Sequence, residues 1–163
     1  VVLALGRRGT PRKLGIPGEG LPKVMYGLIE AEAYVNAKIL VVGGGDSAVE
    51  AALGLAHQKG NQVTLSYRQG EFSRIKERNA QRIADAIRTK KIRGLFNSRP
   101  VEVREKSVLI DHEGTVSEIP NDWVWVFAGG EPPKAFLEKV GVAMGSQDLT
   151  REGGEEARLA MAG

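Results

Sequence analysis

AKILVVGGGDSAVE, residues 37–50, is the stretch that decides the fold of this chain. The apolar run over residues 39–42 is typical of a strand that is buried on both faces of a parallel sheet. Three glycines, residues 43–45, follow at once, and residues 47–59 have the composition of a helix. A G-x-G-x-x-A pattern between a strand and a helix predicts a turn that binds a dinucleotide.

Each small residue of this turn has a distinct expected role. Gly43 allows the tight turn, Gly45 lets the backbone approach a pyrophosphate, and Ala48 lets the helix pack closely on the strand. The phosphates would lie on the free N–H groups at the start of the helix. The alternative is a glycine-rich turn without a ligand. The candidate cofactor-binding residues of this turn are Gly43, Gly44, Gly45, Asp46, Ser47 and Ala48.

The composition narrows the class of protein. The chain has 163 residues, of which 42% are hydrophobic and 26% charged, as in a globular domain with its own core. It has no cysteine, which excludes disulfides, thiolate metal sites and a cysteine nucleophile within it. No apolar run is long enough to cross a membrane and no secretory signal is visible, so we expect a cytoplasmic protein without a membrane partner. A net charge of +3 is too small an excess to indicate nucleic-acid binding.

The hydrophobic periodicity predicts an α/β fold. We expect parallel strands over residues 38–42, 62–67 and 92–96 and helices over 47–59 and 74–90, the second helix burying Ala80, Ile83, Ala84 and Ile87. Residues 101–119 alternate between apolar and polar residues, which predicts a small antiparallel meander with one face in water. A further strand is expected over residues 122–127. The fold class is therefore a Rossmann-like parallel sheet flanked by helices, with a meander beside it.

The two ends of the chain differ from this central part. Residues 1–6 suggest a strand that starts without a methionine, from which we infer a fragment of a longer protein. Residues 7–22 contain several glycines and prolines and are expected to form a linker. Short helices are predicted over residues 25–34 and 133–140. The chain would thus divide into an opening strand and linker (1–22), a nucleotide-binding domain (23–146) and a tail (147–163).

The end of the second predicted strand indicates which nucleotide is bound. An NAD-binding domain has a carboxylate here for the ribose 2′-hydroxyl. This chain has Arg68 instead, and Arg74 follows shortly after. A planar guanidinium suits a 2′-phosphate, which favours NADPH. The alternative is a surface arginine without a ligand.

Other candidate sites are weaker. His57 and His112 show no metal-ligand spacing, and Trp123 and Trp125 share one face of a strand, as packing residues do. The basic residues over 74–93 are not interleaved with aromatic residues, unlike a nucleic-acid surface. No acid–base pair emerges, which suits a domain whose cofactor carries the chemistry.

Several motifs in order resemble the NADPH-binding domain of thioredoxin-reductase-like flavoproteins. These are GGGDSAVEAALGLA (43–56), VTLSYR (63–68), the meander, and VWVFAGGEPPKAFLEKVGV (124–142). The resemblance implies that NADPH passes hydride to FAD, and that FAD-binding segments absent from this chain lie on both sides of it, with residues 1–22 at their edge. It also implies that Ala128, Gly129 and Gly130 line the cofactor opposite the glycine turn.

Two departures from the family pattern refine this resemblance. Thioredoxin reductases carry C-x-x-C before the glycine turn, and this chain has no cysteine. It is therefore more similar to bacillithiol-disulfide-reductase-like proteins and to thioredoxin-reductase-like ferredoxin–NADP reductases. The family run H-R-R-x-x-x-R is also incomplete, with Arg68 retained, Gln69 in the next place, and Ser73 followed by Arg74 at its end.

Two other functions stay open at this point. A non-catalytic NAD(P)(H) sensor would contain the same fold without flanking FAD segments. A methyltransferase-type domain would usually have an acidic residue where Arg68 lies. The electron acceptor is unknown, as is the oligomeric state, although homodimers are common in the family.

Overall fold

The computed structural model describes residues 10–27, 30–131, 138–139 and 141. The chain divides into two compact units, residues 10–130 and a second one made of residues 1–9 and 131–163. The predicted strand over residues 1–6 and the tail over 147–163 lie outside the described residues, as does most of the predicted helix over 133–140. The fold is therefore that of the first unit.

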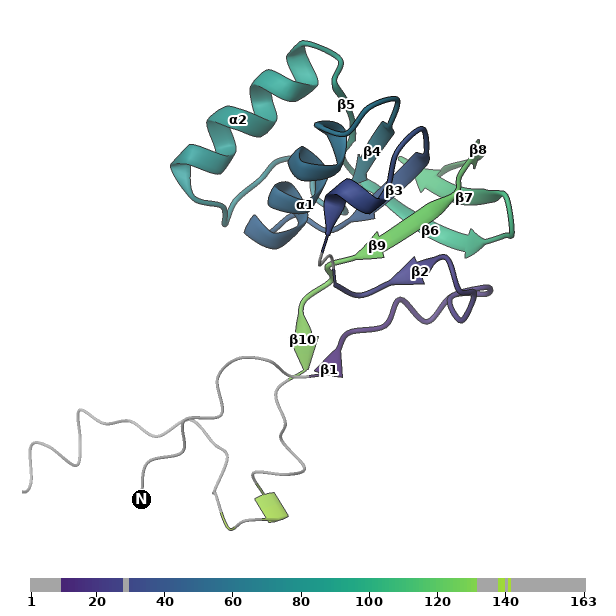
Figure 1. Ribbon diagram of the computed structural model, residues 1–163. Helices are drawn as coiled ribbons and strands as arrows, with labels where there is room; N and C mark the ends of the chain where they lie inside the picture. Colours follow the sequence, from purple (N-terminus) through teal and green to yellow (C-terminus); the bar gives the residue numbers. More distant parts are fainter. Residues whose placement is uncertain (1–9, 28–29, 132–137, 140, 142–163) are drawn as a thin grey trace, which may run out of the picture. The chain divides into compact units, whose positions relative to one another are not determined.

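A five-stranded sheet, parallel throughout, forms the centre of this unit (Figure 1). Its order is β2 (Val24–Met25), β9 (Trp123–Val126), β3 (Lys38–Val42), β4 (Gln62–Ser66) and β5 (Ile92–Leu95). The parallel strands predicted from the sequence are thereby confirmed. Strand β3 lies in the middle because its apolar residues can be buried on both faces.

The side chains of β3 alternate between two hydrophobic clusters. Ile39 and Val41 belong to a cluster with the helices, whereas Leu40 and Val42 belong to a cluster with the meander. Both clusters consist of fully or nearly fully buried side chains. The sheet is thus the middle of three layers, with helices on one face and the meander on the other (Figure 1).

Two helices, α1 (Asp46–Ala56) and α2 (Glu77–Arg88), form the first outer layer. Helix α1 buries Val49, Ala52, Leu53 and Ala56, which lie at spacings of three and four. The stripe predicted for α2 is partly wrong, because Ala84 is exposed while Asn79 and Ala86 are buried with Ile83. Residues 79, 83 and 86 follow one helical face, and residue 84 is turned away from residue 83 by about 100°.

The meander forms the other outer layer and is antiparallel, as predicted. Its strands are β6 (Ser98–Val103), β7 (Ser107–His112) and β8 (Thr115–Pro120). Val103, Val108 and Ile110 are buried against the central sheet. Most of β8 is exposed, which gives the meander its solvent-facing part.

The helix predicted over residues 25–34 is wrong. Met25 lies in the short strand β2 beside Trp125, and among the described residues of this range only 31–33 are helical, as a 3-10 turn (η1, Ala31–Ala33). The open edge of β9 offers backbone partners to the extended segment, and this tertiary pairing overrides the helical spacing of its apolar residues.

The segment before β2 packs on the meander side of the sheet. Leu14, Ile16 and Leu21 contact the second cluster, and the N–H of Val103 donates to the carbonyl of Pro17 at 2.9 Å. The domain boundary predicted at residue 22 stays a prediction. Two short strands, β1 (Thr10–Pro11) and β10 (Gly130–Glu131), pair with each other.

Candidate nucleotide-binding site

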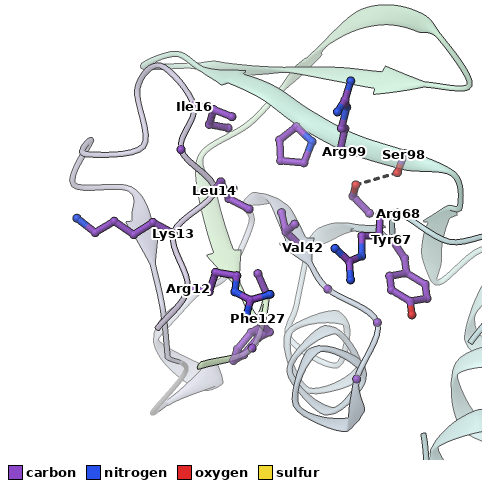
Figure 2. Close-up of a pocket in the computed structure, with 18 of the residues that line it drawn as sticks. Arg12, Lys13, Leu14, Ile16, Val42, Tyr67, Arg68, Ser98, Arg99 and Phe127 are labelled. Atoms are coloured by element: carbon purple, nitrogen blue, oxygen red, sulfur yellow. Dashed lines mark hydrogen bonds between the residues drawn. The ribbon is translucent and has the colours of Figure 1, made fainter. Parts of the chain in front are cut away.

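A cavity of about 730 Å³ opens at the carboxyl ends of β3, β4 and β9 (Figure 2). The chain leaves β3 through α1 toward β4 on one side, whereas β9 lies on the other side of β3. The strand order therefore reverses at β3. Ligands of open α/β sheets bind in the crevice at such a reversal. The position of the cavity follows from this topology.

The glycine turn lines the floor of the cavity. Gly43 has φ +144°, and a Cβ there would lie 2.6 Å from the carbonyl oxygen of Phe127, so this position requires glycine. A Cβ on Gly44 would overlap the ring of Tyr67, whereas nothing lies within 4 Å of a Cβ on Gly45. Gly45 therefore faces open space, as a backbone that approaches a bound phosphate must.

Helix α1 begins beside this open space without a side-chain cap. Its N-cap is Gly45, and no side chain bonds its first turn. The N–H groups at the start of a helix have no partner within the helix, so those of Asp46, Ser47 and Ala48 can bind a phosphate. Ala48 is fully buried at the junction of helix and turn, in agreement with its expected packing role.

The carboxylate of Asp46 bonds to the start of α2. It accepts hydrogen bonds from the N–H of Lys76 at 2.9 Å and from the side-chain amide of Asn79 at 2.7 Å. These bonds hold the pKa of Asp46 below its ordinary value. Asp46 is absent from the lining of the cavity, so its side chain joins the two helices.

Beyond the glycine turn, two exposed arginines line the side of the cavity that follows β4. Arg68 lies two residues after the end of β4 and Arg74 lies before α2. Tyr67 stacks on Phe72 with ring centroids 5.6 Å apart, and Phe72 contacts Phe96 edge-on. This aromatic cluster supports the segment that carries both arginines.

The end of β9 lines the cavity opposite the glycine turn. Phe127 donates its N–H to the carbonyl of Val42 at 2.7 Å, which holds the two strand ends together. Ala128 and Gly129 follow it in the lining, but Gly130 does not belong to the lining. Of the three residues expected here, the structure thus brings two to the cavity.

Two further segments line the cavity and were not expected from the sequence. Residues 12–17 come from the predicted linker and residues 98–101 from strand β6. The basic pair Arg12–Lys13 is the one sequence signal for the first segment. In the second segment the only basic residue is Arg99, and a single arginine in an alternating strand does not by itself indicate a ligand site.

The charged residues that line the cavity all carry positive charge. Among the described residues its lining includes five basic residues and no Asp or Glu, the basic residues being Arg12, Lys13, Arg68, Arg74 and Arg99, of which Arg99 is paired with Asp111 at 3.2 Å. Such a lining, together with free helix N–H groups and an open glycine turn, fits a ligand with several phosphates.

The remaining candidates lie elsewhere. No cluster of metal-ligating side chains occurs in the part of the chain that the structure describes. Trp125 is fully buried and Trp123 partly so, and both contact Tyr34 edge-on, as packing residues. None of the described helices is long and apolar enough to cross a membrane.

Comparison with known proteins agrees with this geometry. The family model for pyridine nucleotide-disulphide oxidoreductases matches residues 1–155. The chain belongs to this family. Ferredoxin–NADP reductase of Ignicoccus hospitalis is 34% identical over 156 residues, covering 91% of this chain and 49% of that protein. Bacilliredoxin reductase of Bacillus subtilis is 35% identical over 143 residues, covering 86% and 44%.

Solved structures of two reductases are also similar to this chain. Bacillithiol disulfide reductase from Bacillus cereus superposes with a TM-score of 0.80 at 32% identity, over 85% of this chain and 43% of that one. Thioredoxin reductase from Lactococcus lactis superposes with a TM-score of 0.71 at 31% identity, over 84% and 49%. The resemblance noted in the sequence is confirmed. The chain spans about half the length of the relatives that it matches.

Proposed function

We propose that this chain is the NADPH-binding part of a flavoprotein reductase. The single observation that carries the proposal is the cavity itself: basic residues, an open glycine turn and the start of a helix meet at the carboxyl ends of the strands, with no acidic residue in the described lining. Ligand recognition at such a point is typical of dinucleotide-binding folds. The names of the ferredoxin–NADP reductase relatives favour the 2′-phosphorylated cofactor.

In this proposal each part of the site has its own task. The backbone of Gly43–Gly45 and the N–H groups of Asp46, Ser47 and Ala48 hold the pyrophosphate. Arg68 and Arg74 hold the 2′-phosphate, because a guanidinium offers two parallel donors to a phosphate. Ala128 and Gly129, which follow β9, line the part of the cavity that would hold the nicotinamide half of NADPH. Bound NADPH would supply hydride to FAD, and this chain would orient it.

The proposal extends to the whole protein. FAD-binding segments outside residues 1–163 would hold the flavin, with residues 1–22 at their edge. The acceptor would be a disulfide or a redox protein, as the names of the relatives suggest. A homodimer and a cytoplasmic location remain predictions.

Calorimetric titration of the chain with NADPH and, separately, with NADH tests the proposal. We expect tighter binding of NADPH, and we expect Arg68→Ala to weaken it by roughly tenfold because a charge-assisted hydrogen bond is lost. Arg78→Ala, an exposed arginine of α2 outside the cavity, is the matched control and should change nothing.

Each result has a clear meaning. Equal binding of NADPH and NADH, unaffected by Arg68→Ala, would contradict the 2′-phosphate assignment. Binding of neither nucleotide would contradict the nucleotide site.

A further inference from the structure

The segment over residues 12–17 is anchored to the nucleotide cavity. The N–H of Arg12 donates to the carbonyl of Gly129 at 2.9 Å, and the carbonyl of Pro17 accepts the N–H of Val103 at 2.9 Å. A Cβ on Gly18 would overlap the carbonyl oxygen of Val103, so the backbone lies directly on strand β6. The predicted linker is therefore part of the cavity wall.

The side chains of Arg12 and Lys13 take opposite directions from this wall. In Figure 2, Arg12 extends toward the glycine turn, whereas Lys13 points away from the cavity. Arg12 has no ion-pair partner among the described residues. A guanidinium without a carboxylate partner, aimed into a cavity without acidic side chains, is arranged to meet an anionic ligand.

Arg12 and Arg68 approach the glycine turn from different sides. Arg12 is joined to the segment that follows β9, and Arg68 follows β4. Strand β3 lies between β9 and β4. The two guanidinium groups thus flank the glycine turn (Figure 2). NADPH carries two separate anionic groups, a pyrophosphate in its middle and a 2′-phosphate.

We propose that Arg12 binds the pyrophosphate of the nucleotide, opposite the N–H groups that begin helix α1. The inference rests on the proposed function and adds to it a residue from the segment that precedes strand β2. The pyrophosphate carries two negative charges. The helix N–H groups would neutralise one side of it and Arg12 the other.

The experiment compares three probes on four versions of the chain. NADPH contains both phosphate sites, NADH contains only the pyrophosphate, and 2′-AMP contains only the 2′-phosphate. Calorimetric dissociation constants are measured for the unaltered chain and for Arg12→Gln, Lys13→Gln and Arg68→Gln. Lys13→Gln is the matched control, because it removes the same charge from the adjacent residue, whose side chain points away (Figure 2).

We expect Arg12→Gln to weaken NADPH and NADH by the same factor, roughly tenfold, and to leave 2′-AMP unchanged. Arg68→Gln should show the complementary pattern, with NADPH and 2′-AMP weakened and NADH unchanged. Lys13→Gln should change no affinity by more than about twofold. Arg12 is exposed, so its variant should unfold at the same temperature as the unaltered chain.

Three results would overturn the inference. Arg12→Gln could bind NADH as tightly as the unaltered chain, it could lose 2′-AMP together with NADPH, or Lys13→Gln could weaken both dinucleotides equally. In each case NADPH binding by the unaltered chain would leave the proposed function standing. If the unaltered chain bound neither dinucleotide, both proposals would fail together.

Discussion

The ring of Tyr67 lies directly against the backbone of Gly44, so that a Cβ at residue 44 would come within 2.1 Å of Cε2 of Tyr67. The hydroxyl of Tyr67 donates to the side chain of Gln69 at 2.6 Å, and its ring stacks on Phe72. Residue 44 must therefore be glycine, because the ring of Tyr67 occupies the place where a Cβ would lie. Because Arg68 is the next residue, the position of the ring determines how Arg68 enters the cavity.

Gly44→Ala should therefore weaken NADPH binding while the backbone of the glycine turn stays in place. The added methyl group displaces the half-exposed ring of Tyr67 and moves Arg68 with it. We expect NADPH affinity to fall roughly tenfold and the free energy of unfolding to fall by about 1 kcal/mol. Calorimetry with NADPH and NADH and urea unfolding measure these changes. An equal loss for both nucleotides would show that the turn itself had moved.

Gly43 and Gly45 should respond to alanine in opposite ways. Gly43→Ala should cost about 1–3 kcal/mol of stability, because φ is +144° and the methyl group would meet the carbonyl of Phe127. Gly45→Ala should leave stability within about 0.5 kcal/mol, because its φ of −97° suits any residue and nothing lies near its Cβ. The same change should lower dinucleotide affinity at least about tenfold, since the methyl group occupies the space for the pyrophosphate.

Thermal unfolding and nucleotide titration of both variants check this contrast. A destabilised Gly45→Ala variant, or one that still binds NADPH at the original affinity, would contradict the open approach to the glycine turn.

The bond between Tyr26 and Glu19 should make the segment over residues 12–17 sensitive to pH. The hydroxyl of Tyr26 donates to Glu19 at 2.5 Å, and the N–H groups of Leu14 and Gly15 donate to the same carboxylate. Burial raises the pKa of Glu19, but these three bonds outweigh it and hold the pKa below its ordinary value of 4.5. Burial and the bond to Glu19 raise the pKa of Tyr26 from 10.0 to about 12.

The direction of the pH effect follows from these shifts. The contribution of Glu19 to the free energy of unfolding is complete above pH 4.5 and is lost as the pH falls below that value. The contribution of Tyr26 is complete below pH 10.0 and is lost as the pH rises toward 12. Tyr26→Phe should lower the free energy of unfolding by at most about 1 kcal/mol at neutral pH, because the pair is half exposed.

Urea unfolding of Tyr26→Phe beside the unaltered chain measures this difference at several pH values. The difference should shrink between pH 10 and about 12. Tyr34→Phe is the control, since the hydroxyl of Tyr34 only reaches the sulfur of Met25 at 3.5 Å. A difference that did not change with pH would argue against the bond.

Asn61 should not tolerate aspartate. Its amide donates to the carbonyls of Tyr34 and Leu55, and its oxygen accepts the N–H of Ala37. In Asn61→Asp both carbonyls would face a carboxylate oxygen, so we expect a loss of about 1–3 kcal/mol, measured by urea unfolding at pH 7. Asn36→Asp, on an exposed residue, should cost less than about 0.5 kcal/mol. Equal effects would show that the bonds of Asn61 are unimportant.

Trp125 should be the larger contributor to stability of the two tryptophans. It is fully buried between β3 and β2, and Tyr34 contacts its ring at 4.7 Å between centroids. Trp125→Ala should cost about 3–5 kcal/mol, because it leaves a large cavity in the core. Trp123→Ala, at a half-buried position of the same strand, should cost clearly less. Thermal unfolding of the two variants decides the order.

The sequence by itself determined the fold class and the centre of the site. The apolar run of β3, the glycine turn, the helix after it and the alternating meander are local patterns, because the periods of strands and helices and the φ preference of glycine act over a few residues. Arg68 was predictable for the same reason, since its place follows from the end of a strand.

The tertiary structure alone decided which other segments complete the cavity. Arg12 and the residues of β6 reach it because the first segment packs on the meander and the meander packs on the sheet. The hydrogen bonds of the Asp46 carboxylate to the start of α2 depend in the same way on neighbours far along the chain. So does the need for glycine at residue 44, beside the ring of Tyr67. No local period encodes such contacts, because they are set by how whole layers pack against one another.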